Sequence, residues 1–152
     1  MDRDTLLQLD NQVCFALYAC AREVTKLYRP FLDELGLTYT QYVTLLALWE
    51  KDEVPVKALG ERLYLDSGTL TPLLKKLEAM KLILRKRDAA DERSVIVKLT
   101  SEGHALKERA FSIPERVFCQ TNIPPEELEQ LREQLRRLTQ NIHQSDSCHS
   151  QT

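Results

Sequence analysis

The chain has 152 residues, a formal net charge of −2 and 43% hydrophobic residues, which fits one folded domain with a core of its own. Its 21 Lys and Arg stand against 23 Asp and Glu, so the overall charge does not indicate a nucleic-acid-binding protein. No apolar run approaches the ~18 residues of a membrane-spanning helix, and the chain opens with acidic residues where a signal peptide is basic. We therefore expect a cytoplasmic protein with no membrane partner.

The first third of the chain predicts two helices. Apolar and small residues recur at helical spacing over residues 9–28, and this helix is expected to end near Arg29 and Pro30. A helix start at residues 38–41 leads into a second, buried helix. Residues 52–55 are expected to break that second helix.

The middle of the chain predicts a helix, a tight turn and another helix. The two helices span residues 56–63 and 67–80, and Asp66 or Ser67 is expected to cap the second of them. Pro72 falls in the first turns of that helix, where a missing N–H is tolerated. This turn is the strongest structural signal in the chain.

A β-hairpin is predicted directly after this pair of helices. Strands at residues 82–87 and 94–99 flank a charged tip at 88–93. This order of elements is that of a winged helix, in which the second helix enters the major groove of DNA and the hairpin reaches the adjacent backbone or minor groove. Residues 57–98 carry 10 basic and 6 acidic residues, a net +4, whereas the remainder carries 11 basic and 17 acidic residues, or −6. The nearly neutral average therefore conceals a basic segment.

Two more helices and a tail are predicted for the rest of the chain. The first begins at residues 100–103 and is expected to run to about Cys119 with a bend at Pro114. Residues 124–127 open the last helix with proline and acids, which the helix N-terminus favours. Residues 144–152 are expected to form a disordered tail. The predicted fold class is mainly α with a small β-hairpin wing.

The second helix of the pair and the wing supply the candidate DNA contacts. Short hydroxyl side chains early in this helix suit phosphates and base edges, and two later lysines supply charge for phosphates. In the wing, an arginine held by a carboxylate is suited to a narrow minor groove. An ordinary solvated face is the alternative, but helix-turn-helix, wing and local positive charge coincide. The residues assigned to DNA binding are Ser67, Thr69, Thr71, Lys75, Lys76, Arg87, Asp91 and Arg93.

Five sequence motifs resemble the MarR family of regulators, and more narrowly the organic-hydroperoxide-sensing repressors called OhrR. The motifs are NQVCFALYA at 11–19, TYTQY at 38–42, YLDSGTLTPLLK at 64–75, RKR at 85–87 and DERS at 91–94. The resemblance covers about residues 9–143. It implies a homodimeric winged-helix repressor, not an enzyme, that binds a pseudo-palindromic operator in double-stranded DNA and uses no cofactor.

The resemblance also implies how the chain is organised. Residues 1–152 would form a single MarR-type domain, with the DNA-binding lobe at about 54–100. The first and last helices of the family make the dimer interface, and they correspond here to about 9–34 and 101–143. The tail at 144–152 lies outside both parts.

A thiol sensor follows from the same resemblance. The family's reactive thiol matches Cys14, and the two phenols that bind this sulfur from the partner subunit match Tyr28 and Tyr39. Members with a second, resolving cysteine carry it in the helix after the wing, which matches Cys119. The implied mechanism is oxidation of Cys14 by an organic hydroperoxide and an intersubunit disulfide with Cys119 that releases the operator.

The spacing of residues in the first helix agrees with such a site. Cys14, Tyr18 and Tyr28 fall on one helix face, so Tyr18 is expected to line the sensor pocket. Tyr28 is 14 residues beyond Cys14, about 21 Å along a helix, so its phenol reaches the sulfur only from another copy of the chain. The alternative is that Cys14 is a buried small hydrophobe, as single cysteines often are.

The other two cysteines are expected to play no part in sensing. Cys20 is predicted to be a packing residue, since it lies on a different face from Cys14. Cys148 stands in the tail near His143 and His149, and we expect no metal site there. Two alternative functions remain: release by a non-covalent phenolic or aromatic acid with Cys14 lining its pocket, and a thiol peroxidase that uses Cys14 catalytically.

Overall fold

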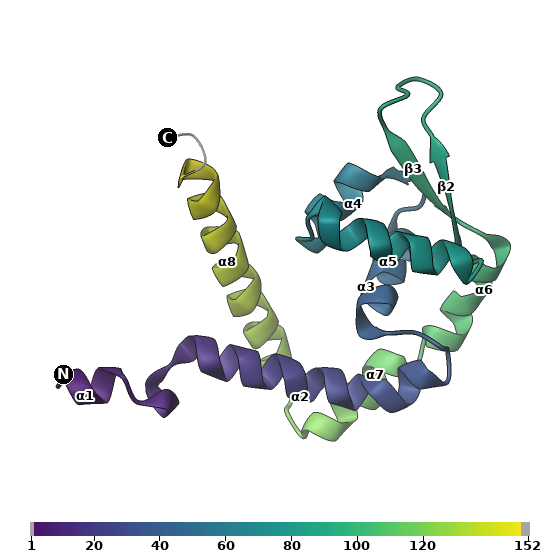
Figure 1. Cartoon of the computed structure of the whole chain (residues 1–152). Coiled ribbons are helices and arrows are strands. Elements are labelled where there is room, and N and C mark those ends of the chain that lie inside the picture. Colours follow the sequence, from purple (N-terminus) through teal and green to yellow (C-terminus); the bar gives the residue numbers. More distant parts are fainter. Residues whose placement is uncertain (1, 150–152) are drawn as a thin grey trace. The chain divides into compact units, whose positions relative to one another are not determined.

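The computed structural model describes residues 2–149, with side chains described up to Asp146 (Figure 1). The chain divides into two compact units, one ending at Ile113 and the other beginning at Pro114. We describe each unit by itself. No helix among the described residues is both long and apolar enough to cross a membrane.

The first unit opens with α1 (Arg3–Leu6), the short 3-10 helix η1 (Leu9–Asn11) and the long helix α2 (Val13–Asp33). The predicted start at residue 9 is wrong, because the Gln12 amide donates to the carbonyls of Leu6 and Gln8 at 2.7 and 3.0 Å and holds a separate turn there. The predicted end near Pro30 is also wrong. Pro30 lies close to the C-terminus of the helix, where its missing N–H removes one bond only.

Helix α3 (Tyr39–Glu50) starts where the sequence indicates. The Thr38 hydroxyl accepts from the Gln41 backbone N–H at 3.3 Å, and the Gln41 side chain accepts from the Thr38 N–H at 3.0 Å, so the two residues form a capping box. The helix is apolar on most sides, and Tyr42, Leu45 and Leu48 are buried. It is therefore the central helix of this unit.

The predicted helix pair is confirmed as α4 (Val56–Leu63) and α5 (Ser67–Ala79). Tyr64 ends α4 in the left-handed conformation, with φ of 55°. Asp66 caps α5, because its carboxylate accepts from the Thr69 backbone N–H at 2.8 Å. Figure 1 shows the two helices next to each other, with a hairpin extending away from them.

That hairpin is the predicted wing, formed by β2 (Ile83–Arg87) and β3 (Val95–Leu99) as an antiparallel pair. A third strand, β1 (Val54–Pro55), pairs with the other edge of β3 and gives the order β1-β3-β2. The sequence predicted only a helix break there, because two residues carry no strand periodicity. The mainly helical fold with a small winged hairpin is confirmed.

Side-chain hydrogen bonds tie the base of the wing to the loop after α3, and tie α3 to α6 (Ser101–Ala110). The Asp52 carboxylate accepts from the Leu99 N–H at 2.9 Å, and the Trp49 indole N–H donates to the Gly103 carbonyl at 2.9 Å. Thr100 caps α6 by accepting from the Gly103 N–H at 3.0 Å. These bonds fix the wing against the centre of the unit.

The chain between α6 and the last helix is broken where one bent helix was predicted. Helix α6 ends at Ala110, and α7 (Ile113–Phe118) and the 3-10 helix η2 (Cys119–Thr121) follow. The break precedes Pro114 because proline fits the first turn of a new helix, where its missing N–H costs nothing.

The second unit contains α8 (Pro125–His149), which extends beyond the predicted end. The expectation of a disordered tail from residue 144 is wrong up to His149. No Gly or Pro follows residue 125 to stop the helix, and the Ser145 hydroxyl bonds back to the Asn141 carbonyl at 2.9 Å. The last part of the predicted tail, 150–152, lies outside the described residues.

Candidate DNA-binding surface and thiol site

Helix α5 has one buried and one exposed face. Its buried face consists of four leucines that are at most 9% exposed, namely Leu70, Leu73, Leu74 and Leu77. Its exposed face carries four of the five residues assigned to DNA in this helix, namely Ser67, Thr69, Lys75 and Lys76. Thr71 is half-buried at the border between the two faces. The leucines hold the helix against the core, so the hydroxyls and lysines face solvent.

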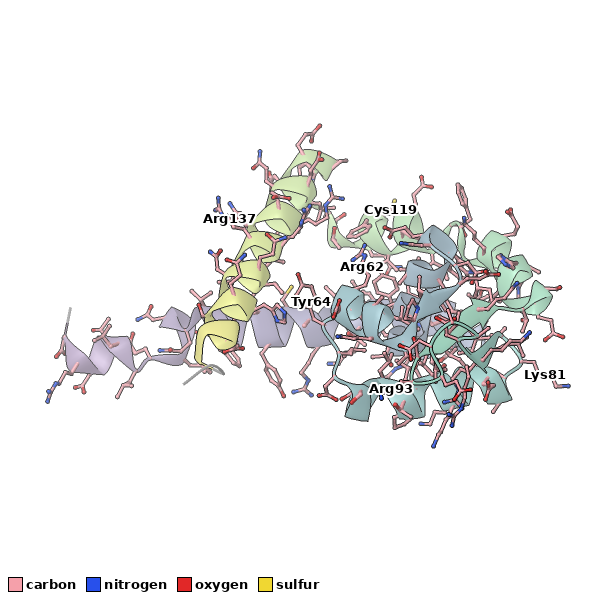
Figure 2. All side chains as sticks on the ribbon, turned by 90° about the horizontal axis from the view of Figure 1, so that it is seen from above. Arg62, Tyr64, Lys81, Arg93, Cys119 and Arg137 are labelled. Atoms are coloured by element: carbon pink, nitrogen blue, oxygen red, sulfur yellow. The ribbon has the colours of Figure 1, made fainter. Side chains whose placement is uncertain are left out.

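The wing tip is ordered by hydrogen bonds from its own acidic residues. The sequence predicted that Asp91 holds the guanidinium of Arg93, but its carboxylate instead accepts from the Arg93 backbone N–H at 3.0 Å. No ion pair between these two side chains occurs in the part of the chain that the structure describes. Arg93 thus remains exposed on the wing (Figure 2), and the Arg87 guanidinium donates weakly to the Glu92 carbonyl at 3.4 Å.

A clamp between Glu78 and Arg85 joins α5 to the wing, and sequence reasoning missed it. The Glu78 carboxylate accepts from the Arg85 guanidinium at 3.1 Å and from the Arg85 backbone N–H at 3.0 Å. Hydrogen bonding from Arg85 lowers the pKa of Glu78 below its ordinary value. The clamp therefore couples the direction of the wing to that of α5. Opposite charges on either side of the turn at Lys81 were the only sequence signal for it.

Three tyrosines pack together where α2 meets α3. The Tyr28 ring lies 5.1 Å from the Tyr39 ring and 5.7 Å from the Tyr42 ring, measured between centroids. Burial, with the neighbouring phenols, raises the pKa of Tyr28 to about 12. Burial also raises the pKa of Tyr39. Both phenols are therefore protonated near neutral pH and available as hydrogen-bond donors.

The raised pKa of Tyr28 predicts a loss of stability at alkaline pH. Tyr28 ionises at a higher pH in the folded chain than its ordinary pKa of 10.0 implies. Its contribution to the free energy of unfolding is therefore complete below pH 10 and disappears between pH 10 and about 12. We expect the free energy of unfolding of the wild type to fall in this window by about 2 kcal/mol more than that of Tyr28→Phe. Urea unfolding at a series of pH values measures the free energy of unfolding of the wild type and of Tyr28→Phe. Equal alkaline losses in the two proteins would contradict the prediction.

The candidate sensor thiol, Cys14, is exposed in the first turn of α2. Tyr18, one turn later, is 60% exposed. Cys119 is exposed in η2 and belongs to the second unit. Cys20 is exposed as well, so the prediction that it packs inside the chain is wrong. No group of three potential metal ligands occurs among the described residues, and the side chain of Cys148 lies outside them.

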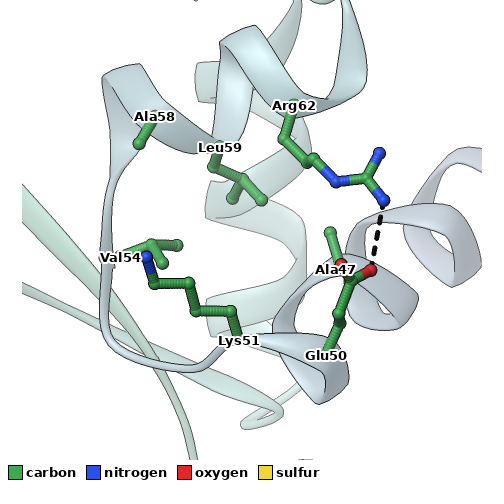
Figure 3. A pocket seen from close by; sticks show the side chains of 7 residues that line it. All are labelled: Ala47, Glu50, Lys51, Val54, Ala58, Leu59 and Arg62. Carbon is green, nitrogen blue, oxygen red and sulfur yellow. Dashed lines mark hydrogen bonds and ion pairs between the residues drawn. The ribbon is translucent and has the colours of Figure 1, made fainter.

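A pocket of about 260 Å³ lies between α3 and α4 (Figure 3). Its apolar lining is formed by Ala47, Val54, Ala58 and Leu59. Three charged side chains complete it, Glu50, Lys51 and Arg62, and the Arg62 guanidinium is paired with the Glu50 carboxylate at 3.1 Å. Cys14 does not line this pocket. Sequence reasoning missed this pocket, because the residues that line it are scattered over 16 positions of two helices and a strand.

Known proteins resemble the chain over most of its length. A family model described as transcriptional regulator SarA/Rot matches residues 26–110. The organic hydroperoxide resistance transcriptional regulator of Bacillus subtilis is 50% identical over 140 residues, which are 92% of this chain and 95% of that protein.

Two solved structures of AbfR of Staphylococcus epidermidis share the fold. Reduced AbfR bound to DNA matches with a TM-score of 0.76 and 32% identity, covering 92% of this chain and 97% of that chain. Disulfide-formed AbfR matches with a TM-score of 0.62 and 34% identity, covering 90% and 96%. Because these relatives are regulators, the thiol peroxidase alternative is not retained. The chain belongs to the MarR family of winged-helix transcriptional regulators, in the group that includes the organic hydroperoxide regulators.

Proposed function

We propose that this chain is a homodimeric repressor that leaves its operator when an organic hydroperoxide oxidises Cys14. The observation that carries the proposal is an exposed thiol in the first turn of α2, in a chain that also has a complete winged-helix surface. The Bacillus subtilis relative, which is half identical, is named for organic hydroperoxide resistance and supports this assignment.

DNA binding is assigned to α5 and the wing. Helix α5 enters the major groove, where Ser67 and Thr69 face phosphates and base edges and Lys75 and Lys76 neutralise phosphates. Thr71, at the edge of that face, is the least accessible of the assigned contacts. The wing carries Arg87 and Arg93 toward the neighbouring minor groove, and Asp91 fixes the turn that presents Arg93. Structures of AbfR on DNA support this mode of binding.

Dimerisation is assigned to the first and last long helices. The N-terminal part of α2 exposes Val13 by 68% and Tyr18 by 60%. Helix α8 exposes a stripe at helical spacing that consists of Leu131, Leu135, Leu138 and Ile142. Apolar surfaces of this kind mark protein interfaces. A two-fold dimer places two copies of α5 one DNA turn apart, about 34 Å, which suits a pseudo-palindromic operator.

The first chemical step is a two-electron oxidation of sulfur. The Cys14 thiolate attacks the terminal peroxide oxygen, the O–O bond breaks, and the alkoxide that leaves takes a proton from water to become an alcohol. Sulfur becomes a sulfenic acid. Tyr28 and Tyr39 of the partner subunit are assigned as donors to the Cys14 sulfur, and their protonated phenols support this role.

Cys119 is assigned as the resolving thiol. Its sulfur attacks the Cys14 sulfenic acid of the partner subunit, and a disulfide and one water molecule are formed. Cys119 is exposed in a short 3-10 helix, where rearrangement costs little. The crosslink then shifts the helices that set the separation of the two α5 helices. The disulfide-formed structure of AbfR supports such a step in this family.

Operator binding of three proteins, the wild type, Cys14→Ser and Cys119→Ser, tests the proposal before and after addition of cumene hydroperoxide. We expect the wild type to release DNA and to form a dimer-sized band on a non-reducing gel, with reversal by thiol reductants. Cys14→Ser should stay on DNA because it has no oxidisable sensor. Peroxide release of DNA from Cys14→Ser would refute the sensor assignment, and a dimer band in Cys119→Ser would refute the resolving role.

A second candidate function is release by a phenolic or aromatic acid, and the pocket between α3 and α4 favours it. Val54 and Leu59 supply an apolar floor for a ring, and Lys51 supplies positive charge for a carboxylate. The other cation of the lining, Arg62, is paired with Glu50. Salicylate added to Cys14→Ser on the operator separates the two candidates. Release of DNA by salicylate from this variant, which lacks the candidate sensor thiol, would establish the second function, and continued binding would exclude it for this ligand.

A further inference from the structure

The two strands of the wing are held to the rest of the unit in different ways. Strand β3 pairs on one side with β1 as far as Ile96, whereas β2 lies at the edge of the sheet. Within the described residues, Glu78 is the one side chain outside the hairpin that hydrogen-bonds to β2, and it does so at Arg85. None of the described residues 86–96 is buried. Arg85 is therefore the hydrogen-bonded attachment of β2 nearest to the wing tip.

The clamp holds Arg85 by its backbone and by its side chain. The Glu78 carboxylate accepts from the Arg85 N–H at the open edge of β2, and it also pairs with the guanidinium of a side chain that is only 25% exposed. Among the described side chains, the Arg85 Nε is the one buried nitrogen or oxygen without a hydrogen-bond partner. A partly buried charge costs free energy unless it is paired. Loss of Glu78 would therefore drive the guanidinium out to solvent and release the edge of β2.

An ion pair on the opposite face of the hairpin lacks these features. Lys98 of β3 pairs with Glu53, and the two side chains are 47% and 57% exposed. Lys98 follows the buried Val97, so its side chain lies on the other face of the strand. Water solvates both groups when such an exposed pair is broken, and the pair contributes little to stability. It therefore serves as the matched control for the clamp.

We propose that Glu78 and Arg85 set how deeply the wing enters the minor groove, and thereby determine the preference of this chain for A·T pairs beneath the wing tip. The inference rests on the proposed function, because it requires that Arg93 reaches the minor groove. The hairpin extends about five residues beyond Arg85, or about 16 Å. A rotation of about 10° at Arg85 would move the tip by about 3 Å, which is half the width of a minor groove of ~6 Å.

Glu78 and Arg85 are positioning residues in this assignment, and neither contacts DNA. A narrow A·T-rich minor groove attracts an arginine by its negative potential, and a G·C pair places an amino group in the same space. Only an arginine inside the groove meets that amino group. A wing that stays outside contacts the phosphate backbone, which is the same for every base pair. The clamp therefore acts on base preference more than on total affinity.

The test adds a minor-groove amino group without changing the major groove, by replacing adenine with 2,6-diaminopurine. The probe is a DNA duplex that the wild type selects from a random pool. Pairs at which diaminopurine weakens binding by the wild type but not by Arg93→Ala lie beneath the wing. Fluorescence anisotropy then gives the ratio of affinities for the plain duplex and for the duplex substituted at these pairs. Partial unfolding of a variant cancels in this ratio, because it weakens binding to both duplexes equally.

We expect the wild type to bind the substituted duplex about tenfold more weakly than the plain duplex. In Arg85→Gln and Glu78→Ala this ratio should fall to below about threefold, because the wing no longer enters the groove. Arg85→Lys keeps the charge and the backbone N–H that Glu78 binds, so it should stay near the wild-type ratio. Glu53→Gln, the control on the opposite face, should keep that ratio as well.

Four results would contradict the assignment. An unchanged ratio in both Arg85→Gln and Glu78→Ala would show that the clamp does not direct the wing. Loss of the ratio in Arg85→Gln alone would make Arg85 a direct DNA contact. An equal loss in Glu53→Gln would reduce the effect to a general loosening of the hairpin. If Arg93→Ala shows the same interference as the wild type at every pair, the minor-groove role of the wing fails, and the role of the clamp fails with it.

Discussion

Gly103→Ala is expected to destabilise the protein by about 3 kcal/mol or more. Gly103 is buried in the first turn of α6, and a Cβ atom there would lie 2.1 Å from the Leu82 carbonyl oxygen and 3.1 Å from a methyl group of Leu99. The Leu82 carbonyl cannot retreat easily, because it also accepts from the Thr100 N–H at 3.0 Å. The substitution must therefore separate α6 from the base of the wing.

Urea unfolding measures this effect, and Gly36→Ala is the matched control. Gly36 has a φ of 68°, and an added Cβ would meet nothing within 4 Å. Its replacement should cost only the backbone strain of the left-handed conformation, about 1–2 kcal/mol. A loss in Gly103→Ala no larger than that in Gly36→Ala would mean that the close approach at Leu82 is relieved by a small shift.

The helix pair and the wing could be predicted because their signals are local. The cap at Asp66, the proline in the first turns of α5 and the alternation of β-branched residues in β3 each act within a few residues. Local propensity and tertiary packing agree over this segment, so the predicted and observed boundaries differ by only one residue at most. The start of α3 at Thr38 was recognisable for the same reason.

Other features depend on contacts between distant segments and left little trace in the sequence. The strand β1 exists because Val54 and Pro55 pair with β3, about forty residues later. The prediction that Asp91 binds a guanidinium failed because a carboxylate two residues before an N–H satisfies the backbone first. Cys20 is exposed because α2 contacts the rest of its unit mainly through its C-terminal part, where Tyr28 and Leu32 are buried.

The candidate thiol site was predictable only in part. The positions of Cys14 and Tyr18 on α2 follow from helix periodicity alone. The packing of Tyr28 against Tyr39 depends on the angle at which α2 meets α3. The spacing of residues along one helix does not predict that angle. The proposed pairing of Cys14 with Cys119 comes from the family resemblance alone, because residues so far apart in the sequence follow no local rule.

The double variant Lys75→Ala/Lys76→Ala is expected to lose on the order of a hundredfold to a thousandfold in operator affinity at about 0.1 M salt. Both lysines are exposed on α5, on the side away from its buried leucines. A phosphate contact contributes through counterion release, so each lost contact lowers the slope of log affinity against log salt by about 0.9. Four lost contacts in a dimer lower this slope by about 3.6. Fluorescence anisotropy with a labelled operator at several salt concentrations measures both quantities.

The matched control is Lys26→Ala/Lys107→Ala, which removes the same charge from α2 and α6. If α5 binds the phosphates, this control should keep nearly the whole salt slope, because general attraction between protein and DNA is a small part of it. Phosphate contacts carry no base information, so the lysine variant should weaken operator and random DNA by similar factors. Equal loss of slope in the two double variants would contradict the assignment of α5 as the DNA-binding helix and leave only a diffuse charge effect.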